Sequence, residues 1–195
     1  MGLGKQAKVL SKHQQAAVLS FLTTTRRAER NKVIFLLSVR AGLRAKEIAF
    51  ITWSMVTDAE GRISEVINLQ NVASKGKSGG VIWMNEELRS ALAEYQAIRT
   101  YSDANDRIIK TERGQNTSAQ VIVNMFQIWY RKLGFEGCSS HSGRRTFITN
   151  AARKISTVGG SIRDVQVLAR HSSLQMTQRY IECDVEAQKK IVQLI

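Results

Sequence analysis

Apolar side chains recur at helical spacing near the start of the chain. Ser11, with Gln14 three residues later, has the pattern of a capping box and predicts that a helix begins there. The apolar stripe of this helix consists of Ala17, Val18, Phe21 and Leu22. A second, largely buried helix should follow and stop at Gly42, because glycine favours helix ends. Its periodic positions are Val33, Ile34 and Leu37.

The pattern changes between residues 56 and 84. Residues 65–69 alternate between apolar and polar side chains, and residues 81–83 are rich in residues that favour strands. The segment between them, from Ser74 to Gly80, is glycine-rich and basic, which is typical of a turn. We therefore expect a small antiparallel sheet with Lys75 at or near the tip of its turn.

Helical spacing returns after Asn85. One predicted helix has its apolar face at Leu88, Leu92 and Tyr95. Residues 101–117 are polar and predicted as loop, and Ser118 is predicted to cap a helix with Ile122, Phe126, Trp129 and Leu133 on one face. Further helices are expected over residues 142–153 and 162–168, around Tyr180, and over 185–195. The pattern predicts a mainly α protein with a small antiparallel β-sheet (α+β), forming a single domain over residues 1–195.

Charge adds a class of partner to this picture. The chain of 195 residues has a formal net charge of +13 and a sequence pI of about 10.2. Residues 1–30 hold six Lys or Arg against one acid, and residues 131–154 again hold six against one. Such an excess favours a polyanionic partner, and nucleic acid fits better than a membrane surface. The ordinary alternative is a basic surface that only keeps the protein soluble.

The cysteines and the hydropathy narrow the setting. Cys138 and Cys183 make neither a disulfide framework nor a metal-ligand spacing, so we expect a reduced, cytoplasmic protein without a metal or another cofactor. No apolar run of about 18 residues is present, so no membrane span is expected.

Groups suited to a phosphodiester are spread along the chain in one order: Arg44, Lys75, His141, Arg144, His171 and Tyr180. Two guanidinium forks can hold the two non-bridging oxygens of a phosphate and neutralise the charge that builds there. A lysine can protonate a departing oxygen, and histidines can donate hydrogen bonds or move protons near neutral pH. The tyrosine is then the nucleophile of the set, with its phenol activated by surrounding cations.

Each of these residues also has an ordinary interpretation. The pair His141 and Arg144 is a short spacing that arises often by chance, and a lone Tyr180 is more often packed than catalytic. Lys77 competes with Lys75 for the place in the turn. Glu47 is more often a structural brace than a catalytic group. The joint order of the six residues favours one phosphate-handling site over coincidence.

The motifs around these residues resemble those of the tyrosine recombinases, the phage integrase family. The resemblance spans about residues 8 to 185, nearly the whole chain. It is carried by residues 41–48, by Lys75 in the turn, by residues 141–147, by residues 165–173 and by Tyr180.

The resemblance implies roles for the six residues. Tyr180 would attack the scissile phosphate and form a 3′-phosphotyrosyl intermediate, and Arg44 and Arg144 would bind the phosphate. Lys75 would protonate the 5′ oxygen. His141 would assist proton transfer, and His171 would hydrogen-bond the phosphate. A 5′ hydroxyl of a second strand would reverse the reaction, so neither ATP nor a metal would be needed.

The sequence departs from the family pattern at several positions. Gly143 stands where an apolar residue is common, Arg170 stands where glycine is usual, and Trp83 stands where proline is usual. Arg170, Lys77 and Arg145 are expected to contact DNA. Barely ten residues precede the catalytic region, so no separate N-terminal core-binding domain is expected, a plan similar to that of the fimbrial-switch invertases and short integrases.

The implied partners are double-stranded DNA with specific recombination sites, further copies of the chain in a dimer or tetramer on that DNA, and accessory DNA-bending proteins. The helix over 185–195 has two interpretations: it covers the core of its own chain, or it docks on a neighbouring subunit. Integration, excision and inversion all fit. Two other functions stay open, namely a DNA-binding regulator without turnover and a nicking enzyme similar to type IB topoisomerases.

Overall fold

Helices dominate the protein, with one two-stranded antiparallel sheet. The computed structural model describes residues 6–71, 73, 79–99, 103–111, 116–180, 192 and 193. The chain divides into two compact units, residues 1–147 and 148–195, and the boundary falls within helix α6 (Ser142–Lys154). The prediction of a mainly α protein with a small antiparallel sheet is confirmed.

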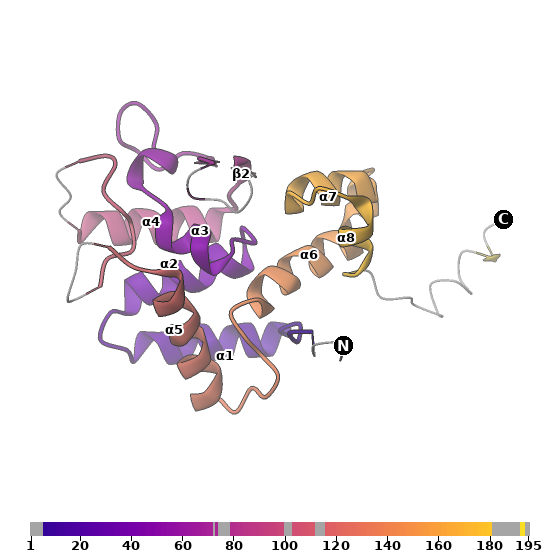
Figure 1. Ribbon diagram of the computed structural model, residues 1–195, viewed down its shortest axis with the longest axis horizontal. Coiled ribbons are helices and arrows are strands. Elements are labelled where there is room, and N and C mark those ends of the chain that lie inside the picture. Colours follow the sequence, from indigo (N-terminus) through magenta and orange to yellow (C-terminus); the bar gives the residue numbers. More distant parts are fainter. Residues whose placement is uncertain are drawn as a thin grey trace. The chain divides into compact units, whose positions relative to one another are not determined.

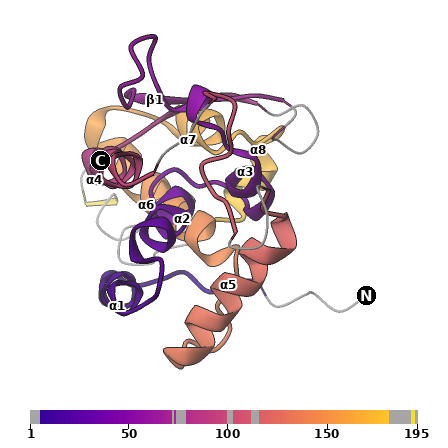
Figure 2. The same ribbon diagram turned by 90° about the vertical axis from the view of Figure 1, so that its left-hand side faces the viewer.

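The core of the first unit is built around α2 (Ala28–Val39), which packs between α1 (Lys12–Thr23) and α4 (Glu86–Ala97), as Figures 1 and 2 both show. Every side chain in residues 33–39 is buried, since this stretch is apolar on all sides apart from Ser38. Burial of each large apolar side chain contributes about 1.5–3 kcal/mol, so this central helix anchors the unit. The predicted capping box at Ser11 is confirmed at the start of α1.

The end of α2 is set by Gly42, as the sequence predicts. Gly42 has a φ of 64°, and the N–H of Leu43 returns to the carbonyl of Leu37. A Cβ at position 42 would lie 2.5 Å from Cδ1 of Phe147, so both the backbone and the packing require glycine. The chain then enters α3 (Ala45–Phe50), which packs on α5 (Ala119–Lys132), and Ser118 caps α5 as predicted.

The sheet pairs β1 (Val66–Leu69) with β2 (Gly80–Trp83) in antiparallel register, with Val66 opposite Trp83. β1 buries alternate residues, Ile67 and Leu69, and contacts the short 3₁₀ helix η1 (Trp53–Met55). The predicted strands are therefore confirmed. The turn residues Lys75 and Lys77 lie outside the described residues.

The second unit contains the later turns of α6, the 3₁₀ helix η2 (Ile155–Val158), α7 (Ile162–Ala169) and α8 (Leu174–Gln178). α7 packs against both η2 and α8. A helix around Tyr180 is a wrong prediction: α8 ends at Gln178, and Tyr180 lies in the turn that follows. The periodicity there is too short to distinguish a helix from a turn.

The predicted helix over 185–195 falls outside the described residues, apart from residues 192 and 193. In the part of the chain that the structure covers, helices are too short or too polar to cross a membrane.

Candidate active site

Arg44 stands at the start of α3 and is held by Glu47. One carboxylate oxygen of Glu47 accepts the backbone N–H of Arg44 at 2.8 Å, and the other accepts Nη1 of its guanidinium at 2.9 Å. The Glu47 side chain is fully buried, whereas that of Arg44 retains 24% of its exposure. Glu47 therefore orients a cation that still reaches solvent, and these contacts are those that a structural brace would make.

Arg144 lies in the first turn of α6 and is buried, with 4% of its surface exposed. Its Nη1 donates to the carbonyl of Gly42 at 2.6 Å, across 102 residues of sequence. Because Gly42 precedes Arg44 by two residues, this bond brings the second arginine onto the segment that carries the first. The structure thus gathers two guanidinium-bearing residues at one place in the first unit.

The start of α6 is fitted closely against α2. A Cβ on Gly143 would lie 2.3 Å from Oγ of Ser38, so the apolar residue common in the family has no room at this position. Thr146 donates from its hydroxyl to the Ser142 carbonyl and accepts the backbone N–H of Leu10 at 2.8 Å. His141, one residue before the helix, is exposed.

The second unit brings His171 and Tyr180 together. Their rings stack with centroids 5.4 Å apart and an interplanar angle of 28°. The residue His171 is 7% exposed, and its Nδ1 lies 3.0 Å from Oγ1 of the fully buried Thr177. The backbone carbonyl of Tyr180 accepts a hydrogen bond from the hydroxyl of Thr149. The backbone N–H of Tyr180 donates to the carbonyl of Thr177. A threonine hydroxyl can donate to Nδ1 or accept from it, and the direction of this bond is linked to the tautomer of the imidazole and so to what Nε2 offers.

Arg170 ends α7 in the left-handed region, with φ 54° and ψ 46°. Among the described residues it is the one non-glycine residue with a positive φ. The usual glycine at this position has a physical reason, because a Cβ is disfavoured there. The bend at Arg170 directs the chain into His171, whose N–H donates to the Gln166 carbonyl.

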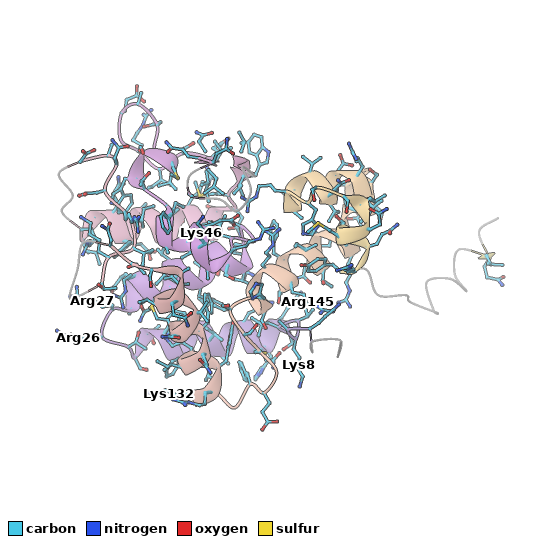
Figure 3. The ribbon with its side chains drawn as sticks, viewed as in Figure 1. Lys8, Arg26, Arg27, Lys46, Lys132 and Arg145 are labelled. Carbon is cyan, nitrogen blue, oxygen red and sulfur yellow. The ribbon has the colours of Figure 1, made fainter. Side chains whose placement is uncertain are left out.

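Further basic side chains of the first unit are held by contacts with their neighbours. Arg145 donates to the side chain of Gln6, and Figure 3 shows Arg145 and Lys8 at one end of this unit. On α3, Lys46 lies over the ring of Phe50 at 5.8 Å, and Arg107 lies over the same ring at 4.0 Å. These contacts hold the cationic side chains in place at a modest energetic gain.

Of the six residues expected from sequence, the structure gathers Arg44 with Arg144 in one unit and His171 with Tyr180 in the other. His141 adjoins the start of α6, and Lys75 lies outside the described residues. The contact of Thr177 with His171 was not predicted. Its signal in the sequence, a threonine six residues after a histidine, carries no periodicity that would single it out. Within the described residues, His, Cys, Asp and Glu form no group of three or more suited to a metal ion.

The chain belongs to the phage integrase family, since the family model of that description matches residues 8–187. Among curated proteins it is similar to tyrosine recombinase XerC of Leptospira interrogans, at 29% identity over 66% of this chain and 41% of the relative. It is also similar to XerC of Thermodesulfovibrio yellowstonii, at 25% identity over 81% of this chain and 52% of the relative. The chain thus spans about half the length of these relatives.

Solved structures share the fold. The XerA recombinase superposes with a TM-score of 0.71 at 22% identity, covering 100% of this chain and 65% of its own. The Tn1549 transposon integrase in complex with transposon right end DNA superposes with a TM-score of 0.75 at 22% identity, covering 98% of this chain and 67% of its own. XerH bound to its difH substrate superposes with a TM-score of 0.74 at 18% identity, over 98% and 53% of the two chains.

Proposed function

We propose that the chain is the catalytic domain of a site-specific DNA recombinase, which cleaves and rejoins DNA through a 3′-phosphotyrosine. The observation that carries this proposal is the bond from Arg144 to the carbonyl of Gly42, two residues before Arg44. Two guanidinium groups that are brought to one short segment repel each other and favour an anion between them. A phosphodiester has the two oxygens that two such forks can bind.

The proposed reaction balances without an external energy source. The phenolic oxygen of Tyr180 bonds to phosphorus and passes its proton to solvent with the assistance of His141, while the bond from phosphorus to the 5′ oxygen breaks. Lys75 protonates that oxygen, so a free 5′ hydroxyl leaves. In the second step a 5′ hydroxyl of another strand attacks the phosphotyrosine and releases the phenol. Removal of one contributing group is expected to lower the rate by about 10²–10⁴.

His171 has a specific part in this proposal. If the hydroxyl of Thr177 donates to Nδ1 at 3.0 Å, then Nε2 carries the proton of the neutral ring. Nε2 can then donate to a non-bridging oxygen of the phosphate without the ring being charged. The stacked ring of Tyr180 would stand beside the phosphate that His171 binds.

The proposed partner is double-stranded DNA. The net charge of +13 supports a polyanion, and the similar Tn1549 integrase and XerH were solved with DNA. Arg145 and Arg170, together with Lys77 in the turn, are proposed to contact the backbone. Recombination joins two sites, so we also propose a dimer or tetramer of the chain on DNA, with accessory DNA-bending proteins where the sites require them. Light scattering of the protein with and without bound duplex tests the assembly.

Trapping of the covalent intermediate tests the chemistry. The protein is incubated with a pool of duplexes that carry a nick beside a randomised segment. After cleavage, the short fragment that bears the new 5′ hydroxyl diffuses away and the covalent intermediate is trapped. Denaturing gels should show a DNA–protein adduct, and sequencing of the trapped DNA identifies the target. Tyr180→Phe should abolish the adduct and leave binding nearly unchanged.

Tyr130→Phe is the matched control. Tyr130 is buried in α5, and its hydroxyl has no hydrogen-bond partner among the described residues, so loss of that hydroxyl should change little. Binding without an adduct in the unaltered chain would instead indicate a DNA-binding regulator. Relaxation of a supercoiled plasmid that lacks the trapped target would indicate a topoisomerase-like enzyme.

A further inference from the structure

A second cationic site lies in the first unit, away from the two arginines described above. It is a recess of about 170 Å³ between the start of α2 and the end of α4. Its charged lining residues are Arg26, Arg27, Glu29, Arg30, Arg99 and Lys110. Five cations and one carboxylate thus line a place that the proposed chemistry does not use, and one of the five, Lys110, is also paired with Asp106, with Nζ 3.0 Å from Oδ2. We call it the α2/α4 pocket.

Contacts with the protein fix the inner cations of this pocket. Arg30 donates to the carbonyl of Lys110 at 3.2 Å and to the side chain of Asn31 at 3.1 and 3.2 Å. The guanidinium of Arg99 lies over the ring of Tyr95 at 5.9 Å. Side chains positioned in this way lose little further entropy when an anion binds.

The outer cations, Arg26 and Arg27, are exposed in the turn before α2. Figure 3 shows them together at the opposite end of the first unit from Arg145, which follows Arg144 in the sequence. Because both side chains are exposed, a large ligand can reach them.

The field inside the pocket is positive. Burial raises the pKa of the Tyr95 hydroxyl, and the charges of Arg99, Arg30 and Arg27 act against that rise. Cations held this close repel one another, and that repulsion is relieved by an anion. Arginine forks suit the oxygens of a phosphate in particular.

The length of α2 separates this pocket from the proposed cleavage site. Arg27 precedes the helix and Arg44 follows it, and a helix of 12 residues is about 18 Å long. Successive base pairs rise by about 3.4 Å, so this length corresponds to roughly five base pairs of duplex. A DNA molecule that extends beyond its cleaved phosphate is therefore long enough to span the separation.

We propose that the α2/α4 pocket binds a backbone phosphate of DNA that flanks the recombination site. This inference rests on the proposed function, because it takes the ligand at the two arginines to be DNA. An inorganic phosphate has the same chemistry as a backbone phosphate, and the experiment below separates these two sources.

Binding is measured by fluorescence anisotropy across a series of salt concentrations, on two duplexes that carry the trapped target. One covers only the target, and the other extends it by about ten base pairs on each side. For the unaltered chain, the extension should steepen the dependence of log affinity on log salt, because each added phosphate contact contributes a slope of about 0.9. Because the pocket binds one phosphate, Arg26→Gln with Arg27→Gln should remove about 0.9 of that slope on the long duplex and none on the short one.

A matched pair of cations outside the pocket provides the control. Arg131 and Lys132 are adjacent, exposed and at the end of α5, so their replacement by Gln removes the same net charge. This control should affect both duplexes alike. Arg26→Lys with Arg27→Lys, which keeps the charge, should restore most of the slope, and thermal melts establish that each variant is folded.

Two results would overturn the inference. Equal slope changes for the pocket variant and the control variant would mean that only net charge matters. The second result has two parts: the longer duplex gives the same salt slope as the short one, and millimolar inorganic phosphate stabilises the unaltered chain but not the pocket variant. That result would assign the pocket to a small anion. Adduct formation by the unaltered chain on the short duplex is scored separately, so failure of the proposed function is recognised independently.

Discussion

Arg170 occupies a backbone conformation that side chains disfavour, so a variant with glycine at this position should be more stable than one with alanine. With φ 54° and ψ 46°, it is the left-handed cap of α7. A residue with a Cβ in this left-handed conformation destabilises the folded state by about 1–2 kcal/mol. Glycine avoids this cost, but its greater conformational freedom in the unfolded chain lowers the free energy of unfolding by about 0.4–1 kcal/mol. The difference leaves glycine ahead of alanine by about 0.5–1 kcal/mol at this position.

The comparison that isolates the backbone is Arg170→Gly against Arg170→Ala. Both remove the guanidinium and its contacts, and they differ only by the Cβ. At an ordinary helical position alanine would be the more stable of the two, by about 1 kcal/mol, so the expected sign is reversed here.

Urea unfolding followed by circular dichroism measures the difference. The midpoint for glycine should exceed that for alanine, with the slope of free energy against denaturant unchanged. If alanine proves equal or more stable, the left-handed conformation is not strained and the reasoning fails. Both variants should also lose about 0.9 from the salt dependence of DNA binding if Arg170 contacts a phosphate.

Three further predictions concern buried contacts. Glu47→Gln weakens the charge-assisted bonds to Arg44, so it should lower the free energy of unfolding in urea by about 1.5–3 kcal/mol and lower the yield of adduct. Unchanged values of both would exclude a bracing role. Thr177→Val removes the hydroxyl beside the imidazole, and should slow adduct formation by about 5- to 10-fold and alter its pH profile, while Thr177→Ser should retain the rate. Gly143→Ala places a Cβ 2.3 Å from Oγ of Ser38 and should cost about 1–3 kcal/mol, a loss that Ser38→Gly should partly restore; strictly additive effects would show that the two positions do not touch.

Much of the secondary structure could be read from short stretches of sequence. The capping box at Ser11 and the cap at Ser118 mark where helices begin, and Gly42 marks where one stops. Each signal lies within one turn of the helix boundary that it sets. The two strands were also predictable, because alternation and a glycine-rich turn are local signals. The turn at Tyr180 was not, since five to six residues hold too little periodicity to distinguish a short helix from its end.

The candidate site divides in the same way. The order and the type of its residues are visible in the sequence, and so is the departure at Arg170 from the usual glycine. The bond of Arg144 to the Gly42 carbonyl is not visible, because it joins positions 102 residues apart. The contact of Thr177 with His171 also needed coordinates, since it depends on how α8 turns back on α7.

By itself the amino-acid sequence determined where most helices and strands form, and it predicts which groups carry the chemistry and that the partner is a polyanion. Those properties follow from local spacing and from composition. Only the tertiary structure decided why Gly143 has no room for a side chain, which carbonyl holds Arg144, and that Arg27 and Arg99 share a pocket. Each of these depends on packing between segments distant in sequence, where close approach is set by the shape of the whole core and leaves no repeating pattern in the chain.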